Sequence, residues 1–325
     1  MLQFDTFCIG SAKIDIFLSI RNESSYVHLN KDANELCVVY GQKIPVDRCS
    51  LQIGGNACNV AVGLSKLQIK TAVMAEIGTD EFAQKIINTL SSENVDTSKI
   101  LQREGQQSSF STILSFKGER TIFSEHVKRN HDFNFENIGA KWAYLTSLGD
   151  KWAEAYRKTI DFVKNTKCGL AFNPGRLQID SGENNIQNVL SLTNILFVNK
   201  EEAMKISNFK FLISNENGEN KNMKSLLESL QKLGPKIVVI TDGENGSFAV
   251  NEKREFFTQP AIPTRIVEKT GAGDAYASGF LAAVLYNLPM QTAMKWGALN
   301  ASGTMSAIGA QNGLLSRKEM EQKFL

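Results

Sequence analysis

The chain has little of what metal centres and disulfide frameworks are built from. It holds only three histidines and five cysteines in 325 residues, and no two cysteines form a Cys-x-x-Cys pair. An odd set of scattered cysteines argues against a disulfide framework or a zinc site, and so few histidines argue against an imidazole-rich metal site. Catalysis is therefore expected to rest on carboxylates, backbone amides and a metal carried by a nucleotide.

Long apolar runs and an excess of one charge are also missing. No apolar stretch is long enough to span a bilayer, and the start, Met-Leu-Gln-Phe-Asp-Thr-Phe, lacks the basic and apolar regions of a signal peptide. The 36 lysines and arginines nearly balance the 34 acids and are scattered along the chain. The chain therefore has no basic stripe that would predict nucleic acid or a membrane surface as a partner. We expect a cytoplasmic protein.

The second half of the chain alternates short apolar segments with amphipathic ones. Strands are expected over 143–146, 169–172, 195–198 and 237–241, and helices over 152–164, 186–192, 201–206 and 223–233. Such alternation predicts βαβ units around a mostly parallel sheet. The polar stretch 215–222 is expected to be an exposed loop.

The first half adds short strands that do not fit this alternation. Residues 6–20 predict one strand, with Asp15 at its end; 36–53 predict short strands with turns; and 109–116 with 121–123 predict a hairpin around 117–119. Between them, Gly54-Gly55-Asn56 opens a helix over 57–67, which a strand over 71–77 and a capped helix over 80–90 follow. We expect one main α/β domain over 1–325 that carries a small β appendage.

The most informative run is Lys269-Thr270-Gly271-Ala272-Gly273-Asp274, which leads into a helix expected over 275–286. The two glycines let consecutive N–H groups point at one spot, and a helix N-terminus adds partial positive charge, so an anion such as a phosphoryl group can bind there. Asp274, at the start of that helix, has the placement of a general base. The alternative is that Asp274 only caps the helix and the glycines only serve a turn.

Two other phosphate motifs can be tested on the same residues. The chain contains no Gly-x-x-x-x-Gly-Lys-Ser/Thr run, which excludes a P-loop. After Gly271-x-Gly273, the third glycine position of a dinucleotide-binding motif is occupied by Tyr276. A dinucleotide site is therefore only weakly indicated.

Three segments together resemble the ribokinase-like carbohydrate kinase family, often called the PfkB family. Residues 268–274 are similar to its Asp-Thr-x-Gly-Ala-Gly-Asp motif and share its Gly-Ala-Gly-Asp end at 271–274. Residues 54–61 are similar to its first glycine-rich motif, and residues 199–202 match its Asn-x-x-Glu motif. The resemblance covers nearly the whole chain. It implies a three-layer α/β/α domain with a mostly parallel central sheet, and a small β-sheet lid formed by segments about 16–53 and 108–126.

The resemblance also implies roles for single residues. Asp274 would be the catalytic base, beside an anion hole formed by Gly271, Ala272 and Gly273. Substrate-binding residues would be Asp15, Gly54, Gly55, Asn56 and Asn59; nucleotide-binding residues would be Asn199, Glu202, Thr241, Gly243, Gly246, Thr270 and Asn300, with Glu202 holding Mg²⁺ through water. Several of these residues have a plainer alternative: a solvated acid for Asp15, a helix start for 199–202, a simple turn for 241–246 and a surface side chain for Asn300.

Two positions depart from the family pattern. Lys13 stands where ribokinases proper tend to have asparagine, so ribose specificity is not implied. Glu268 replaces an aspartate that is associated with a monovalent-cation site in some members, which makes it a candidate K⁺ ligand and leaves potassium dependence open. The turn 172–175 is similar to that of nucleoside-kinase relatives.

The resemblance also bears on the oligomeric state. Lids in relatives often pair between subunits, and this pairing suggests a homodimer.

The resemblance implies an ATP- and Mg²⁺-dependent kinase that phosphorylates a primary hydroxyl of a small sugar. A nucleoside kinase for adenosine, inosine, guanosine or cytidine is the nearest alternative. A non-catalytic sugar or nucleotide sensor would keep the same fold, since fold does not fix function. A nicotinamide-dependent oxidoreductase is disfavoured by the missing third glycine.

Overall fold

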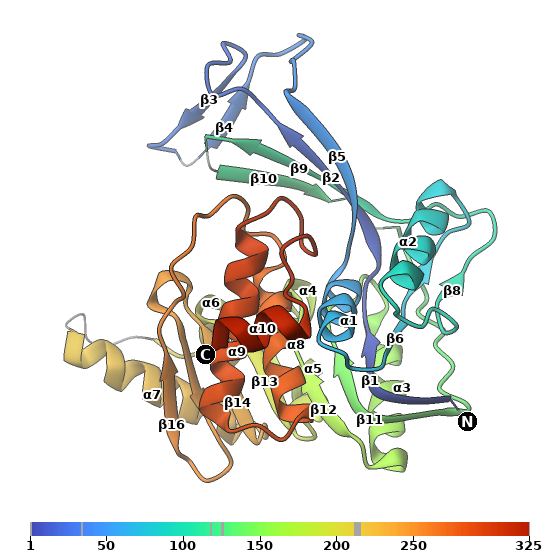
Figure 1. Cartoon of the computed structure of the whole chain (residues 1–325), viewed down its shortest axis with the longest axis vertical. Helices are drawn as coiled ribbons and strands as arrows, with labels where there is room; N and C mark the ends of the chain where they lie inside the picture. Colours follow the sequence, from blue (N-terminus) through green and yellow to red (C-terminus); the bar gives the residue numbers. More distant parts are fainter. Residues whose placement is uncertain (1, 34, 118, 125–126, 211–215, 325) are drawn as a thin grey trace.

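A computed structural model describes residues 2–33, 35–117, 119–124, 127–210 and 216–324. Its centre is an eight-stranded sheet in the order β16-β15-β14-β13-β12-β11-β1-β6 (Figure 1). The strands are β1 Leu2–Ile9, β6 Thr71–Met74, β11 Ile138–Leu145, β12 Gly169–Phe172, β13 Ile195–Asn199, β14 Ile237–Thr241, β15 Ser247–Val250 and β16 Phe256–Gln259. The strands from β14 across to β6 run parallel, and β15 pairs antiparallel with both β14 and β16, so only β15 runs against the others; this confirms the mostly parallel sheet.

Helices cover both faces of this sheet. One face packs against α1 (Asn56–Lys66), α2 (Glu81–Ser92), α8 (Ala272–Leu285) and α9 (Met290–Met305). The other packs against α3 (Trp152–Thr166), α4 (Arg176–Asp180), α5 (Glu183–Leu190), α6 (Lys200–Ser207) and α7 (Glu216–Lys232); α10 spans Arg317–Phe324. Successive strand side chains point to opposite faces, so Cys8 joins the first core and Phe7 and Ile9 the second. The domain is a three-layer α/β/α structure.

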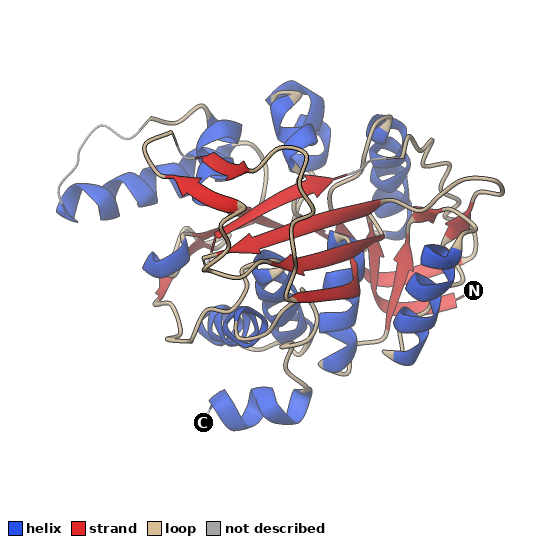
Figure 2. Ribbon diagram, turned by 90° about the horizontal axis from the view of Figure 1, so that it is seen from above, coloured by secondary structure: helices blue, strands red, loops and turns tan. Residues whose placement is uncertain are grey.

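A second, smaller sheet stands above the main one (Figures 1 and 2). Its order is β10-β9-β2-β5, with β2 Lys13–Ser19, β5 Arg48–Gly54, β9 Phe110–Phe116 and β10 Glu119–Ser124; a ribbon of β3 (Val27–Asn30) and β4 (Glu35–Val38) adjoins it. We call these six strands the small sheet. The predicted hairpin is confirmed, and Gly118 of its turn lies outside the described residues, as do 125–126 at the end of the predicted lid segment.

The single strand predicted over 6–20 is wrong. The chain leaves the main sheet after β1, crosses Gly10-Ser11-Ala12 and enters the small sheet as β2, so Asp15 lies inside a strand and not at its end. Both halves have a strand-like local sequence. Their separation depends on distant partners, because β1 pairs with β11 and β6 whereas β2 pairs with β5 and β9.

Two further predictions need correction. The strand expected over 71–77 divides into β6 and β7 (Glu76–Ile77), and β7 pairs with β8 (Leu101–Gln102) outside the main sheet. The loop expected over 215–222 is helical from Glu216 onward as the start of α7, and Asn215 lies outside the described residues. Polar residues tolerate a helical backbone, so polar composition alone did not separate the two states.

The parallel arrangement brings several strand ends to one edge. Strands β1, β11, β12, β13 and β14 all end beneath the small sheet, and ligands of open α/β sheets bind at such carboxyl ends. Across the described ranges, no helix is long and apolar enough to cross a bilayer.

Candidate active site

The turn before α8 is shaped by Gly271. This residue is the helix N-cap, with φ 79° and ψ 2°, a left-handed conformation that favours glycine, and a Cβ there would collide with Ala310. Helix α8 begins at Ala272, earlier than the predicted 275, so Asp274 lies in its first turn. The alternative in which Asp274 caps the helix is therefore wrong.

The first turn of α8 leaves donors and space for an anion. The Ala272 N–H makes a long hydrogen bond of 3.3 Å to the Lys269 carbonyl, whereas Gly273 and Asp274 belong to the first turn, whose N–H groups have no acceptor within the helix. A Cβ added at Gly273 would meet no atom within 4 Å. Gly273 thus keeps the space beside these amides open.

Asp274 is a buried carboxylate held from the opposite helix. Its Oδ2 accepts a hydrogen bond of 2.8 Å from Asn59 Nδ2 on α1, and Asn59 Oδ1 accepts one of 2.9 Å from Gln311 Nε2. Burial raises the pKa of Asp274 to about 7; the Asn59 hydrogen bond opposes this rise and nearby Asp15 adds to it. A carboxylate that exchanges a proton near neutral pH has the property a general base needs.

A cavity of about 340 Å³ opens beside this turn, which we call the anion cavity. Gly271, Ala272, Gly273 and Asp274 line one side, and the strand-end residues Asn173, Asn199 and Thr241 line the other. A smaller cavity of about 150 Å³, which we call the side cavity, shares Thr241, Ala272 and Gly273 with it and also contains Gly243 and Gly246. The structure thus brings the predicted anion hole and the predicted 241–246 loop together.

The small sheet contributes Arg120 to the anion cavity. Its Nη1 donates hydrogen bonds of 2.7 Å both to Glu268 Oε1 and to Thr270 Oγ1. The same Glu268 oxygen accepts the N–H groups of Lys269 and Thr270 at 2.8 and 2.9 Å. Burial raises the pKa of Glu268, but the hydrogen bonds from Arg120 and Thr270 outweigh it and hold that pKa below its usual value. Arg120 therefore pairs with Glu268, the carboxylate that was the candidate K⁺ ligand. Arg120 itself was not predicted from the sequence, because no motif marks β10.

Asn199 and Glu202 form a reciprocal capping box at the start of α6. Asn199 Oδ1 accepts from the Glu202 N–H, and Glu202 Oε2 accepts from the Asn199 N–H, both at 2.9 Å. Both residues also line the anion cavity, and burial raises the pKa of Glu202. The pair thus forms a helix start, which is the plainer alternative. The same pair also brings the Glu202 carboxylate to the predicted phosphate site.

Asp15 lies buried in β2 against the glycine turn. A Cβ at Gly54 would collide with the Asp15 carboxylate, and Gly55, with φ 93°, lies so close to Ser11 that a Cβ would strike the Ser11 carbonyl. Asp15 Oδ1 has no hydrogen-bond partner. Burial raises its pKa to about 6, which Lys13 lowers and Glu268 raises. A buried orphan acceptor is the feature expected of a residue that awaits a ligand hydroxyl.

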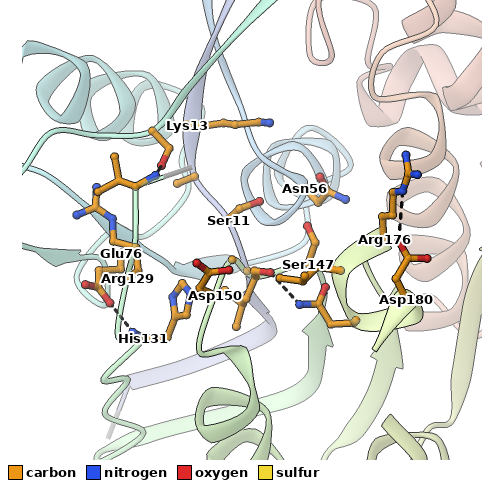
Figure 3. Close-up of a pocket in the computed structure, with 18 residues that line it drawn as sticks. Ser11, Lys13, Asn56, Glu76, Arg129, His131, Ser147, Asp150, Arg176 and Asp180 are labelled. Atoms are coloured by element: carbon orange, nitrogen blue, oxygen red, sulfur yellow. Dashed lines mark hydrogen bonds and ion pairs between the residues drawn. The ribbon is translucent and has the colours of Figure 1, made fainter. Parts of the chain in front are cut away.

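A third cavity, of about 460 Å³, lies at the ends of β1 and β11 (Figure 3). We call it the large cavity, because it is larger than the anion cavity and the side cavity. Asn56 lines both this cavity and the anion cavity, so it marks their junction. The residues of the large cavity that carry polar chemistry and were not predicted as a site include Ser11, Lys13, Arg129, His131, Ser147 and Arg176. Lys13 was noted as a departure from the family pattern and the turn before Arg176 as similar to that of nucleoside-kinase relatives, whereas Arg129 and His131 follow the hairpin without any motif.

Asn300, a predicted nucleotide residue, lines neither the anion cavity nor the side cavity. Its side chain is fully buried, donates to the Ala275 carbonyl and to Ser278 Oγ at 3.0 Å, and accepts the Leu315 N–H at 2.9 Å. It therefore joins α9, α8 and the C-terminal segment in the interior. The alternative of a surface side chain is therefore wrong, and the polar atoms of Asn300 are engaged by protein groups.

Comparisons with known proteins place this site in context. A sequence profile described as pfkB family carbohydrate kinase matches residues 23–317. A 5-dehydro-2-deoxygluconokinase of Geobacillus kaustophilus is 24% identical over 297 residues, which cover 83% of this chain and 84% of that protein. Two solved structures share the fold at TM-score 0.77: a Methanocaldococcus jannaschii nucleoside kinase (20% identical; 100% and 98% covered) and an Arabidopsis thaliana ribokinase complexed with ribose and ATP (18% identical; 99% and 99% covered).

Proposed function

Because the chain belongs to the pfkB family of carbohydrate kinases, and is therefore an ATP-dependent sugar kinase, we propose that Asp274 is the base that activates the accepting hydroxyl. One observation carries this assignment. Asp274 is a buried carboxylate on the first turn of α8, beside the open amides of the anion cavity and oriented by Asn59. A base and an anion site meet there, as phosphoryl transfer requires.

In the proposed transfer, a primary hydroxyl of the sugar lies beside Asp274 and gives its proton to that carboxylate. The hydroxyl oxygen bonds to the terminal phosphorus of ATP while the bond from that phosphorus to the bridging oxygen breaks, and ADP leaves with the electron pair. The turn from Gly271 to Gly273 stabilises the growing negative charge through its N–H groups and the positive end of α8. Asp15 and Asn59 hold the other sugar hydroxyls, with Gly54, Gly55 and Asn56 close to the ring.

Magnesium would enter with the nucleotide and neutralise charge on its phosphates. Within the described residues, no three His, Cys, Asp or Glu side chains gather as a protein-held metal site requires. The donor set fits a hydrated ion, because Glu202 presents a carboxylate to the anion cavity beside Asn199 and would hold it through water. Potassium at Glu268 is not needed, because Arg120 already gives that carboxylate a cationic partner.

The base of the nucleotide would lie in the side cavity next to Thr241, Gly243 and Gly246, and the phosphates of the nucleotide would lie over Gly273. Thr270, which donates its hydroxyl to Glu268 at 2.8 Å, would shape the phosphate turn rather than face the base. We propose that the small sheet is a lid that excludes water from the transfer. Arg120 is the residue through which this lid contacts the phosphate turn.

Exposed apolar side chains on the small sheet support pairing of two copies through the lid. Val38 on β4 and Ile122 and Phe123 on β10 are exposed, as are Val39 and Tyr40 directly after β4. Sheet edges that carry such residues tend to be covered. We propose a homodimer on this ground, which light scattering of the purified protein tests. We also retain the cytoplasm as the proposed location, since the reaction consumes ATP.

The assignment of Asp274 is tested with Asp274→Asn, which keeps the size of the side chain but cannot take the proton. Coupled ADP release should fall about 10²- to 10⁴-fold, while calorimetric ATP affinity stays within about threefold of wild type. Asp161→Asn, at an exposed carboxylate on α3, is the matched control. Near wild-type turnover by Asp274→Asn would remove the base assignment.

A further inference from the structure

The phosphate turn, residues 268–273, rests on a buried carboxylate whose charge is balanced by a side chain of the small sheet. We infer that Arg120 is a built-in cation that takes the place of a bound monovalent ion beside Glu268, so that the order of this turn depends on the small sheet and not on salt. In this role Arg120 is a positioning residue, which acts on the nucleotide through Glu268. The inference rests on the proposed function, because it concerns the nucleotide site of the same transfer.

Glu268 organises the phosphate turn through one oxygen. Its Oε1 accepts the N–H groups of Lys269 and Thr270 at 2.8 and 2.9 Å and the Thr270 hydroxyl at 2.8 Å, so it fixes the two residues that precede Gly271. The side chain of Glu268 is only 5% exposed. Burial raises the pKa of this carboxyl, but the hydrogen bonds from Arg120 and Thr270 hold the pKa below its usual value. A buried, ionised carboxylate therefore lies beneath the proposed site of the ATP phosphates.

A carboxylate in this place needs a counter-charge. An unpaired buried charge is costly, and a negative charge beside the turn also repels the phosphates that the turn is proposed to bind. Two further carboxylates, those of Glu202 and Asp274, already line the anion cavity. A cation beside Glu268 removes one of these repulsions and keeps the Glu268 carboxylate available to the N–H groups of the turn.

Arg120 supplies this cation with fixed geometry. Its Nη1 donates at 2.7 Å to Glu268 Oε1 and at 2.7 Å to Thr270 Oγ1. Glu268 Oε1 thus accepts hydrogen bonds from Arg120, from two N–H groups and from a hydroxyl, which more than fills the lone pairs of one oxygen. A second cation beside the guanidinium would also be repelled by it. These donors do not fit a potassium ion on the same oxygen.

The cation reaches the phosphate turn from the sheet that also carries the proposed sugar acceptor. Arg120 lies on β10, 148 positions from Glu268 in sequence. Strand β10 pairs with β9, and β9 pairs with β2, the strand that holds Asp15. A dissolved ion could reach Glu268 at any position of the small sheet, whereas Arg120 reaches it only when that sheet lies over the turn. The counter-charge of the nucleotide site is therefore supplied by closure of the proposed lid.

The test removes the guanidinium and offers it back as a salt. Calorimetry measures the affinity for ATP with Mg²⁺ at equal ionic strength in tetramethylammonium, potassium and guanidinium chloride, of which the first cation is too large to replace the side chain. Wild-type affinity should vary by less than about twofold among the salts. Arg120→Ala should bind ATP about 10-fold more weakly in tetramethylammonium and recover at least about fivefold in potassium or guanidinium, which can pair with Glu268. Arg157→Gln, at an exposed arginine on α3, is the control and should behave as wild type.

A second variant separates charge balance from direct contact between Arg120 and the phosphates. Arg120→Ala combined with Glu268→Gln removes both charges and keeps a side-chain oxygen that accepts the N–H groups of the turn. In tetramethylammonium it should bind ATP at least about fivefold more tightly than Arg120→Ala alone, and potassium should no longer change its affinity. Coupled ADP release with the best substrate of a panel of pentoses, hexoses and nucleosides should give the same order in kcat/KM.

The outcomes separate this inference from the proposed function. Wild-type affinity that potassium raises about 10-fold overturns the inference and leaves the kinase intact, as does an Arg120→Ala variant that neither cation nor Glu268→Gln improves. Phosphorylation of no compound in the panel overturns the proposed function, and calorimetry with ATP still decides the inference; absence of ATP binding by the wild type overturns both. Should Arg120→Ala fail to fold, the double variant decides, because it leaves no unpaired carboxylate, and an affinity that depends on potassium in that variant overturns the inference.

Discussion

The side-chain amide of Asn59 donates a hydrogen bond of 2.8 Å to the carboxylate of Asp274, across 215 positions of sequence. The contact joins the first turns of α1 and α8, each of which follows a glycine with positive φ. Gln311 holds the Asn59 oxygen, so the amide can present only its N–H₂ group to Asp274. The orientation of the proposed base is therefore fixed by a residue of the first glycine-rich motif.

The pH dependence of catalysis should follow from this pair. The pKa of Asp274 is raised to about 7 and that of Asp15 to about 6, and the proposed base must be ionised, so kcat/KM should rise with pH and level off above about 7. Asn59→Ala removes a hydrogen bond that lowers the pKa of Asp274 and should move this limb to higher pH. Profiles of kcat/KM between pH 5 and 9 check this. A flat profile, or a limb that Asn59→Ala leaves in place, would contradict it.

Stability should respond to the same carboxylate with a defined sign. The folded pKa of Asp274, about 7, lies above the ordinary aspartate value of 3.8, so between about pH 4 and 7 the native state binds a proton that the unfolded state has released. Stability contributed by Asp274 therefore falls as pH rises through this window. Asp274→Asn should raise the free energy of unfolding by about 2 to 4 kcal/mol at pH 8 and have little effect near pH 4. Urea unfolding of both proteins at pH 4 and pH 8 measures the change in the free energy of unfolding. Equal changes at the two pH values would show that the charge of Asp274 does not destabilise the folded state.

Alanine substitutions of Gly271 and Gly273 should have different effects, one on stability and the other on activity. Gly273→Ala adds a methyl group into open space, so it should leave the melting temperature unchanged or slightly raised while lowering kcat/KM for ATP about 10- to 100-fold. Gly271→Ala places a Cβ against Ala310 at a positive φ and should destabilise the fold by about 1 to 3 kcal/mol. Thermal melts and ATP kinetics of both variants separate these effects. Equal loss of stability in the two would mean that Gly273 serves packing.

Removing Arg120 should impair catalysis more than folding. Its side chain is 36% exposed but that of Glu268 is only 5% exposed, so loss of the ion pair should cost about 1 to 3 kcal/mol. Arg120→Ala should nevertheless reduce kcat about 10²- to 10³-fold, as loss of a donor to the transferring group does. Arg120→Lys should recover only part of it, because a lysine has a different donor geometry. Steady-state kinetics with both variants, with Arg157→Gln as a control, test this; full activity of Arg120→Ala would exclude contact between Arg120 and the phosphates.

Asn300 should prove structural. Asn300→Leu removes hydrogen bonds to Ala275, Ser278 and Leu315 from a fully buried position and leaves those partners unsatisfied. We expect a loss of about 2 to 4 kcal/mol in the free energy of unfolding and no change in KM for ATP at a temperature where the variant is folded. A raised KM with unchanged stability would restore Asn300 to the nucleotide site.

Much of the fold could be predicted from local pattern. The strands at 169–172 and 237–241 match the structure residue for residue, and the helix after Gly55 and the Asp80 cap were also confirmed. Predictions failed where a boundary depends on distant partners, as between β1 and β2, or where composition suits two states, as at the start of α7. The anion turn was recognisable because its glycines and Asp274 are contiguous. Arg120, Arg129 and His131 were not, because nothing beside them in sequence marks their role.

The sequence by itself determined the parallel sheet, the glycine turn at the start of α8 and the kinase family, since periodicity and contiguous motifs encode what a few neighbouring residues do. Only the tertiary structure decided which distant groups share one space: Asn59 with Asp274, Arg120 with Glu268, and Arg129 and His131 with Asn56. It also showed that Asn199 and Glu202 cap a helix and that Asn300 lies in the interior. The physical reason is that burial, pKa and charge pairing depend on neighbours brought close by folding, and chain order does not contain that distance.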